Sequence, residues 1–212
     1  MRNVMFFGDS NTHGTPPMPD LDGSGRFAHA LRWTTHFSKA LPDWEVIAEG
    51  QPGRTTLHDD PIEGAHRNGL TVLPALLESH QPLDVVAIML GTNDLKARFS
   101  VTPLDIALSL ARLVTCIRQS GHGVDGGAPL VMIVCPPPII EVGDLGQMFA
   151  GGAAKSQRLA VEVARMAQRM GVPMVDAAPL ITVSPIDGIH YDAPGLPAFG
   201  LALAAAMRHH FG

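Results

Sequence analysis

The sequence predicts a three-layer α/β/α fold of the flavodoxin-like type, with five parallel strands in the order 2-1-3-4-5. Five short apolar runs alternate along the chain with helical patterns, and this alternation is typical of a parallel sheet with helices on both faces. The run Val85–Leu90 is apolar at every position. Such a run is expected for a strand that is covered on both faces.

The apolar runs give the expected strands directly. They are Val4–Phe7, Glu45–Ala48, Val85–Leu90, Leu130–Cys135 and Pro173–Val175. The segments between them that carry helical patterns are Phe27–Leu41, Gly69–Ser79, a stretch that begins after Thr102, Ala153–Met170 and Ala198–His209. Thr102 is a good N-cap, and Pro103 suits the first turn of a helix. Gly171 is a natural stop for the fourth of these helices.

Length and composition fit one globular domain over residues 1–212. Hydrophobic residues make up 46% of the chain, and the formal net charge is −5 from 15 basic and 20 acidic residues. The negative charge argues against nucleic acid as a partner. No apolar run reaches the roughly 18 residues of a membrane span, and no signal peptide is recognisable, so we expect a cytoplasmic protein without membrane association. Cys116 and Cys135 are expected to be buried free thiols.

The residues that follow the predicted strands carry the functional signal, because ligands of an open α/β sheet bind outside the carboxyl ends of its strands. These segments are GDS at 8–10, EGQPGRT at 49–55, GTND at 91–94 and a loop that reaches DGIH at 187–190. Each of them alone could be a plain surface turn. Together they supply a serine, a glycine backbone, an asparagine and an aspartate–histidine pair, which are the components of acyl transfer.

The four blocks in this order resemble those of the SGNH (GDSL) hydrolases over nearly the whole chain. The resemblance is strongest to the small bacterial arylesterase/acyltransferase branch. The segments that carry it are RW at 32–33, EGQPGRTT at 49–56, DDP at 59–61, LGTNDLKARF at 90–99, TPLDIAL at 102–108 and DGIH at 187–190. The first block departs from the GDSLTWG that is usual in that branch, because Asn11 and His13 stand in place of leucine and tryptophan. This departure concerns the wall of the acyl pocket, and hence specificity.

The resemblance implies a role for each matching residue. Ser10 would be the nucleophile, His190 the general base and Asp187 the residue that orients His190. The backbone N–H groups of Ser10 and Gly53, together with the Asn93 amide, would form the oxyanion hole. No cofactor and no metal ion are implied.

Elementary chemistry agrees with these roles. A serine is a weak nucleophile until a base removes its proton, and histidine titrates near the working pH. Asp187 and His190 are three residues apart, so one helical turn could place both side chains on the same face. Asp9 and Asp94 are expected to tie loops through backbone hydrogen bonds.

For other charged residues near these blocks the sequence gives only a location and no catalytic role. The pair Asp59-Asp60 is expected to lie in a solvated loop rather than at a cation site. Arg54, His58 and His66 are further candidates for the pocket wall.

We therefore expect a serine esterase that hydrolyses short-chain, chiefly acetyl, carboxylic esters through an acyl-serine intermediate and can transfer the acyl group to alcohols. Aryl acetates and O-acetylated carbohydrates are the expected substrates. Two alternatives stay open at this point: a thioesterase or lysophospholipase of the same family, which needs a long apolar groove, and a non-catalytic binding module.

The family resemblance also implies a homo-oligomer, with an octamer among its forms. The segments Gly14–Gly25 and Pro136–Gly152 carry apolar residues that could be buried against a neighbouring subunit or could pack within their own loops. These residues are Met18, Leu21, Ile139, Ile140, Leu145, Met148 and Phe149.

Overall fold

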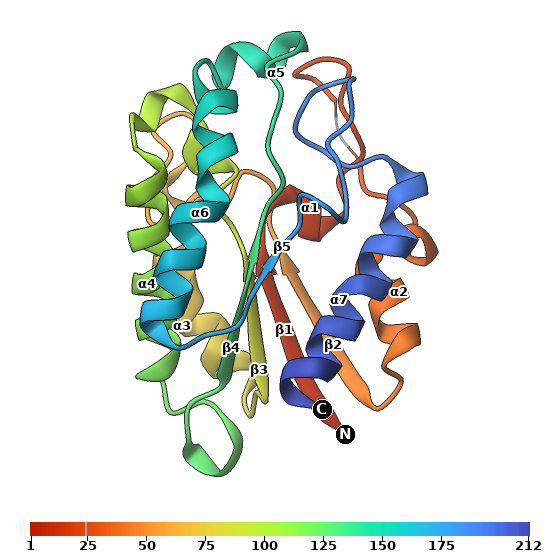
Figure 1. The fold of residues 1–212 in the computed structure, drawn as a ribbon, viewed down its shortest axis with the longest axis vertical. Coiled ribbons are helices and arrows are strands. Elements are labelled where there is room, and N and C mark those ends of the chain that lie inside the picture. The colour runs from red at the N-terminus through yellow and green to blue at the C-terminus, as the bar shows by residue number, and fades with distance from the viewer. Residues whose placement is uncertain (24) are drawn as a thin grey trace.

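A single parallel sheet forms the centre of the protein in this computed structural model, which describes residues 1–23 and 25–212. Its five strands run in the order β2-β1-β3-β4-β5, so the predicted topology is confirmed. The strands are β1 (Arg2–Gly8), β2 (Trp44–Gly50), β3 (Val85–Met89), β4 (Leu130–Cys135) and β5 (Met174–Asp176). Figure 1 shows the strands fanning out between two groups of helices.

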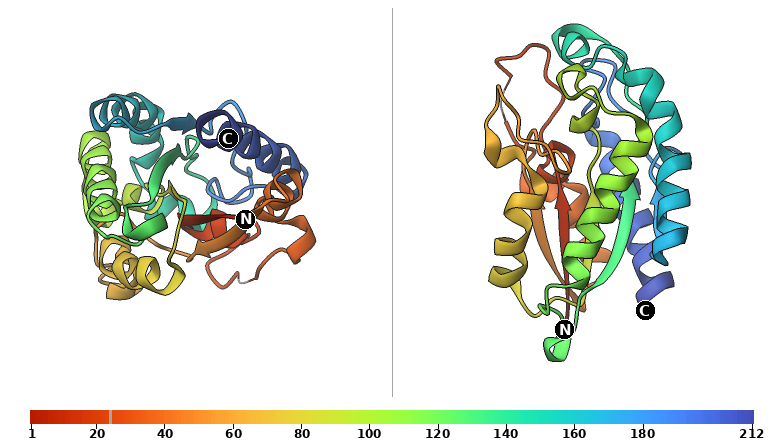
Figure 2. Two further views of the ribbon diagram at one scale, coloured as in Figure 1. Left: turned by 90° about the horizontal axis from the view of Figure 1, so that it is seen from below. Right: turned by 90° about the vertical axis from the view of Figure 1, so that its left-hand side faces the viewer.

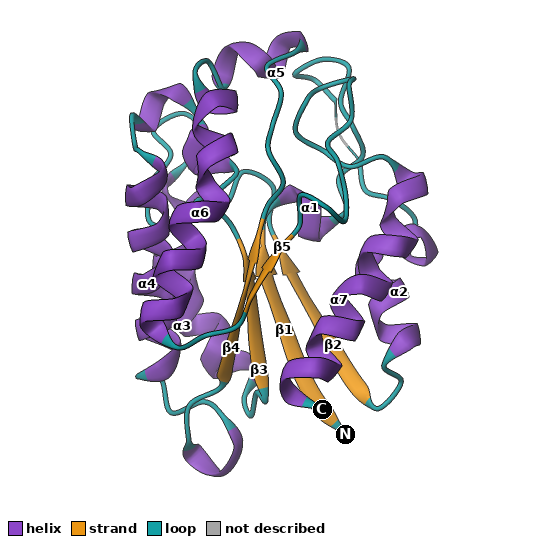
Figure 3. Ribbon diagram, viewed as in Figure 1, coloured by secondary structure: helices purple, strands orange, loops and turns teal. Residues whose placement is uncertain are grey.

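The helices form the two outer layers of the fold. They are α1 (Ser10–His13), α2 (Trp33–Ala40), α3 (Gly69–His80), α4 (Pro103–Arg118), α5 (Gly143–Met148), α6 (Gly152–Met170) and α7 (Leu196–Phe211). Helices α3, α4 and α6 lie on one side of the sheet, while α2 and α7 lie on the other (Figures 1 and 2). The short helix α1 and most of the long loops gather at the carboxyl ends of the strands, while the connection from α4 to β4 lies at the opposite end (Figure 3).

The alternation of side chains along β1 separates two hydrophobic cores. Met5 and Phe7 join the core under α3, α4 and α6, while Val4 and Phe6 join the core under α2 and α7. The ring of Phe6 meets Trp33 of α2 edge-on, with 4.8 Å between centroids. Because successive side chains of a strand point to opposite faces, one continuous apolar run serves both layers.

Helix α4 begins as the sequence predicts. The Thr102 hydroxyl accepts a hydrogen bond from the backbone N–H of Asp105, and the Asp105 carboxylate accepts one from the Thr102 N–H, which is a complete capping box. Helix α6 ends at Met170 and is capped by Gly171, whose φ of 59° is left-handed. The predicted termini of these helices are therefore confirmed to within a residue.

Two segments differ from expectation. The helix expected over 27–41 begins only at Trp33, because Arg32 is extended and the preceding residues His29–Leu31 form a separate 3₁₀ turn. Helix α5 lies inside the segment 136–152, which was expected to be irregular. Six residues are too few to show a helical periodicity in the sequence. In the described part of the chain, none of the helices combines the length and apolar character that a bilayer crossing requires.

Candidate active site

Ser10 lies at the turn from β1 into α1, where it is the first residue of the helix. Asp9 caps this helix, because its carboxylate accepts a hydrogen bond from the Asn11 N–H at 2.9 Å. A Cβ atom on Gly8 would overlap the Thr12 hydroxyl, so glycine is required for β1 and α1 to meet this closely. The GDS block is therefore a strand-to-helix turn that places Ser10 at the carboxyl end of a central strand.

Asp187 and His190 form a buried pair. Asp187 Oδ2 lies 2.6 Å from His190 Nδ1, and the two side chains are only 1% and 4% exposed. The Asp187 carboxylate also accepts hydrogen bonds from the backbone N–H groups of Met18, Ile189 and His190. Burial alone would raise the pKa of Asp187, but its hydrogen bonds and the His190 charge outweigh this and lower the pKa to about 2. An ionised Asp187 can thus orient the imidazole.

The Asp187–His190 pair is built on a tight loop, and the expectation of a helical turn is wrong. Gly188 has a left-handed φ of 75°, and a Cβ atom there would overlap the Ile140 carbonyl. The loop is closed by hydrogen bonds from Gly188 N–H to the Ser184 carbonyl at 2.8 Å and from Ser184 N–H to the His190 carbonyl at 2.7 Å. The pairing holds because glycine permits a bend that an ordinary helix would not contain.

The predicted oxyanion donors come from three strand ends. Gly53 lies after β2 with a φ of 75°, and Asn93 begins a 3₁₀ turn after β3. The Asn93 amide uses one N–H to bond the Arg54 carbonyl at 3.1 Å, which leaves its second N–H available. Among residues 1–23 and 25–212, no acceptor is found for the backbone N–H groups of Ser10 and Gly53.

Two buried ionic side chains fix the loops that carry these donors. The Arg54 guanidinium donates to the Gly8 carbonyl at 2.9 Å and lies 4.3 Å from the centre of the Phe7 ring. Burial lowers the pKa of Arg54 to about 10. Asp94 accepts hydrogen bonds from the backbone N–H and the hydroxyl of Thr56. As expected for Asp94, these contacts join the loop after β3 to the loop after β2.

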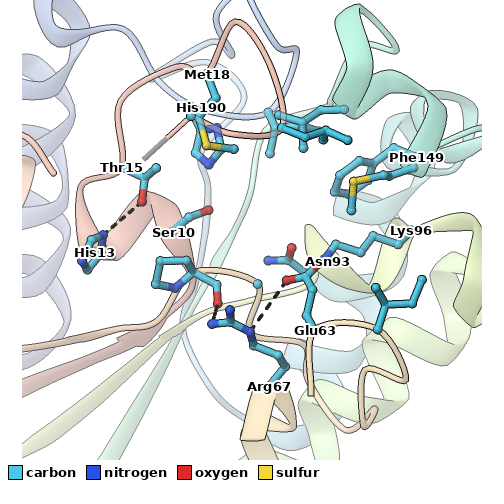
Figure 4. Close-up of a pocket in the computed structure, with 18 of the residues that line it drawn as sticks. Ser10, His13, Thr15, Met18, Glu63, Arg67, Asn93, Lys96, Phe149 and His190 are labelled. Carbon is cyan, nitrogen blue, oxygen red and sulfur yellow. Dashed lines mark hydrogen bonds and ion pairs between the residues drawn. The ribbon is translucent and has the colours of Figure 1, made fainter. Parts of the chain in front are cut away.

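A cavity of about 580 Å³ unites the site. Ser10, Gly53, Asn93 and His190 all line it, and Asp187 contacts the His190 ring without lining the cavity itself. Figure 4 shows Ser10, Asn93 and His190 around the cavity. Within the described residues Ser10 Oγ makes no hydrogen bond to His190, as is common before substrate binds and the catalytic hydrogen bonds tighten. The arrangement can supply a nucleophile, a base and oxyanion donors to one bound carbonyl group.

The charged residues that line the cavity are not the ones that the sequence predicted. Arg54, His58 and His66 do not line the cavity, although His13 does. Four charged residues that we did not single out from the sequence line it instead: Glu63, Arg67, Lys96 and Arg98. Two signals could have pointed to them, namely the i, i+4 spacing of Glu63 and Arg67 and the position of Lys96 two residues after the GTND block.

The expectation that Asp59 and Asp60 lie in a solvated loop is wrong for Asp60. Its side chain is fully buried and pairs with Arg98 at 2.9 Å and with Lys96 at 3.5 Å. Burial tends to raise the pKa of Asp60, but hydrogen bonds from the Glu63 and Ile62 N–H groups and the two cations hold it below its usual value. Asp60 thus anchors Lys96 and Arg98 at the cavity, while Asp59 is exposed as expected.

Comparison with known proteins gives a consistent result. Residues 6–196 match the model of the GDSL-like lipase/acylhydrolase family. An aryl esterase from M. smegmatis in an inhibitor-bound form shares 41% identity, with a TM-score of 0.93 and 99% of each chain covered. A carbohydrate acetylesterase from Sinorhizobium meliloti shares 39% identity, with a TM-score of 0.93 and all of both chains covered. No curated protein matches this chain. The chain belongs to the GDSL-like lipase/acylhydrolase family and is a serine hydrolase with esterase character.

Proposed function

We propose that this esterase hydrolyses acetyl and other short-chain carboxylic esters through an acyl-serine intermediate on Ser10. The observation that carries the proposal is the 2.6 Å contact between Asp187 Oδ2 and His190 Nδ1 beside the cavity that Ser10 lines. An oriented, neutral imidazole next to a hydroxyl at a strand end is what a serine nucleophile requires.

In the first half-reaction Ser10 Oγ attacks the ester carbonyl carbon while His190 Nε2 accepts the hydroxyl proton. Asp187 holds the other ring nitrogen in its protonated form and stabilises the imidazolium that results. The carbonyl oxygen becomes an oxyanion, which the N–H groups of Ser10 and Gly53 and the Asn93 amide stabilise. When the bond to the alcohol oxygen breaks, His190 returns the proton to the leaving alcohol.

In the second half-reaction water attacks the acyl-serine. His190 accepts a proton from the water, the second tetrahedral intermediate collapses, and the proton returns to Ser10 Oγ as the carboxylic acid leaves. The same donors stabilise both oxyanions, because the carbonyl oxygen occupies the same place in each.

Aryl acetates and O-acetylated carbohydrates are the substrates that we favour. Support comes from the similarity to an aryl esterase and a carbohydrate acetylesterase. One side of the cavity is apolar, with Met18, Leu21, Leu145, Met148 and Phe149. A thioesterase or lysophospholipase would need room for a long chain. A series of 4-nitrophenyl esters from acetate to palmitate separates the two, and we expect kcat/KM to fall as the chain lengthens.

We also propose that the acyl group passes to alcohols as well as to water. Support comes from the apolar residues at the cavity, since an apolar vestibule lowers the access of water to the acyl-serine. His13 also lines the cavity and makes its wall more polar than a tryptophan would. With an activated acetate and a primary alcohol in water, we expect ester and acid together, and acid alone at every alcohol concentration would contradict transfer.

The nucleophile is tested by covalent labelling. A phosphonate inhibitor should add one adduct to the intact protein and none to Ser10→Ala, with the modified peptide containing Ser10. The variant should keep its circular dichroism spectrum and lose activity by about 10³-fold or more. Labelling at another residue, or near-normal turnover of the variant, would contradict the mechanism.

Homo-oligomerisation and a cytoplasmic location stay predictions. Of the apolar loop residues named above, Ile139, Leu145 and Phe149 are buried within the chain itself, whereas Leu21 and Ile140 are 57% and 40% exposed. The loops therefore pack partly on themselves, and fewer residues are left for a neighbouring subunit. Light scattering at micromolar concentration measures the assembly directly.

A further inference from the structure

The cavity has two chemically different sides. In Figure 4 Met18, His190 and Phe149 lie in the upper part of the view and Glu63 and Arg67 in the lower part, with Ser10 and Lys96 between them. We call the second side the charged wall, and it consists of Glu63, Arg67, Lys96 and Arg98. The function proposed above uses none of these four residues.

Glu63 lies at the centre of the charged wall. Its Oε1 pairs with Lys96 Nζ and lies 3.6 Å from Arg98, and its Oε2 lies 3.7 Å from Arg67 Nε. A Cβ atom on Gly53 would overlap Glu63 Oε2, so this carboxylate oxygen rests against the backbone of a proposed oxyanion donor. The side chain is 25% exposed, and it therefore reaches the cavity rather than being sealed behind it.

The wall is held rigidly from behind. The buried Asp60 carboxylate accepts hydrogen bonds from the Ile62 and Glu63 backbone N–H groups and pairs with Lys96 and Arg98. The Lys96 side chain is only 3% exposed, so its ammonium group is paired with Asp60 and Glu63 and is not solvated by water. Glu63 is thus fixed both at its backbone and at its carboxylate before any substrate enters.

Arg67 retains hydrogen-bonding capacity. Its guanidinium donates to the Pro52 carbonyl, while its Nε is buried and makes no hydrogen bond within the described residues. The Nε lies against the Glu63 carboxylate, so the donors of Arg67 that remain for a ligand are terminal N–H groups that do not bond the Pro52 carbonyl. Arg67 and Glu63 therefore present donors and an acceptor side by side.

We propose that Glu63 and Arg67 bind hydroxyl groups on the alcohol half of the substrate, so that the enzyme favours polyhydroxylated alcohols such as sugars. The inference rests on the function proposed above, because a short acyl group leaves only the alcohol half large enough to reach the wall. A hydroxyl group both donates and accepts, which matches a carboxylate beside a guanidinium.

The charges favour a hydroxylated group over an anionic one. Three cationic and two anionic side chains leave this cluster, including Asp60, with a net charge of only +1. An anion bound by Arg67 would also meet the Glu63 carboxylate at 3.7 Å from its Nε. A neutral polyol avoids that repulsion.

The test compares three acetate esters on the wild type, Glu63→Gln and Arg67→Gln. The esters are a 6-O-acetyl hexose, phenyl acetate and 4-acetoxybenzoate, which present a polyol, an apolar ring and an anionic ring. We expect each variant to lose about tenfold or more in kcat/KM on the hexose ester relative to phenyl acetate, which is the usual loss for one charged hydrogen bond. The loss should appear mainly in KM if the hydroxyl contacts also exist in the ground state.

A matched control is Glu162→Gln, which removes the exposed ion pair with Arg165 on α6, away from the cavity. This variant should leave the ratio of kcat/KM on the hexose ester to kcat/KM on phenyl acetate unchanged. Equal losses on all three esters would show a structural role and overturn the proposal, as would an Arg67→Gln loss confined to 4-acetoxybenzoate, which would indicate an anion site. Turnover of phenyl acetate without turnover of the hexose ester by the wild type would overturn the inference alone. Failure on every ester would overturn the proposed function itself.

Discussion

The side-chain amide of Asn11 donates a hydrogen bond to the carbonyl oxygen of Ile189 at 3.1 Å. This contact joins the helix that begins at Ser10 to the loop that ends at His190. The backbone carbonyl of Asn11 in turn accepts a hydrogen bond from Trp33 Nε1 at 2.8 Å, which ties the junction to α2. The distance between the proposed nucleophile and base therefore depends on a side chain that performs neither role.

Asn11→Ala should lower kcat about tenfold with little change in KM. The variant keeps Ser10 and His190 but releases the loop that positions the base, and small misplacements of reacting groups are costly. Asn3→Ala is the matched control, because Asn3 Nδ2 makes a similar 3.0 Å bond to the Pro82 carbonyl at the far end of β1. Steady-state kinetics of both variants check this, and equal kcat values for the two would contradict the positioning role.

The strands and the blocks at their ends could be predicted from the sequence because both are local signals. Apolar runs mark the strands, GDS lies at the end of β1, GTND follows β3 closely, and DGIH lies in the loop after β5. The charged wall could not be predicted in this way, because Glu63 and Lys96 come from separate loops that meet only in the folded chain. The buried state of Asp60 was missed for the same reason, since its partners Lys96 and Arg98 lie more than thirty residues away.

The contact of Asp187 with His190 shows a different limit of prediction from the sequence. The spacing of three residues was the correct signal for the pair, but the bend between them depends on Gly188 and the Ile140 carbonyl. Nothing local to 187–190 indicates that this carbonyl lies there. The residues of the pair could thus be predicted, and the backbone that unites them could not.

Asn93→Ala should lower kcat by about 10²- to 10³-fold, because one preorganised donor to the oxyanion is lost. The Asn93 side chain also bonds the Arg54 carbonyl, so the variant could shift the loop after β2. Urea unfolding of Asn93→Ala measures that structural effect by itself, because an oxyanion donor acts only once a substrate is bound. Single-turnover kinetics with an activated acetate are the measurement, and a change confined to KM would contradict the oxyanion role.

Asp187→Asn should reduce kcat strongly, but by less than His190→Ala, because the base remains when only its orientation is lost. The asparagine can still accept from the Ile189 and His190 N–H groups, so the loop should survive. In the wild type Asp187, whose pKa is lowered to about 2, should stay ionised into the acid range and keep its orienting role there. Equal losses in the two variants would contradict this division of roles.

Asp9 should make the protein less stable at neutral pH than a neutral residue in its place. Asp9 is 1% exposed, and its carboxylate accepts one hydrogen bond, from the Asn11 N–H. Burial raises its pKa from 3.8 to about 6, although that hydrogen bond and the charges of His190 and Arg54 oppose the increase. The pKa of Asp9 is higher in the folded than in the unfolded protein, so the folded state binds the proton more tightly. The contribution of this proton to the free energy of unfolding is therefore fully present below pH 3.8 and is lost as the pH rises through 6.

Asp9→Asn removes this cost while its amide oxygen can still cap α1. The difference between the two pKa values corresponds to at most about 3 kcal/mol, so the variant should be more stable than the wild type at pH 8 by up to that amount. The advantage should shrink between pH 6 and pH 4, where the wild-type carboxyl is protonated in the folded state. Urea unfolding of both proteins across this range measures the difference. A constant difference at all pH values would mean that the charge of Asp9 is not its cause, and a less stable variant at pH 8 would show that the cap depends on the ionised carboxylate.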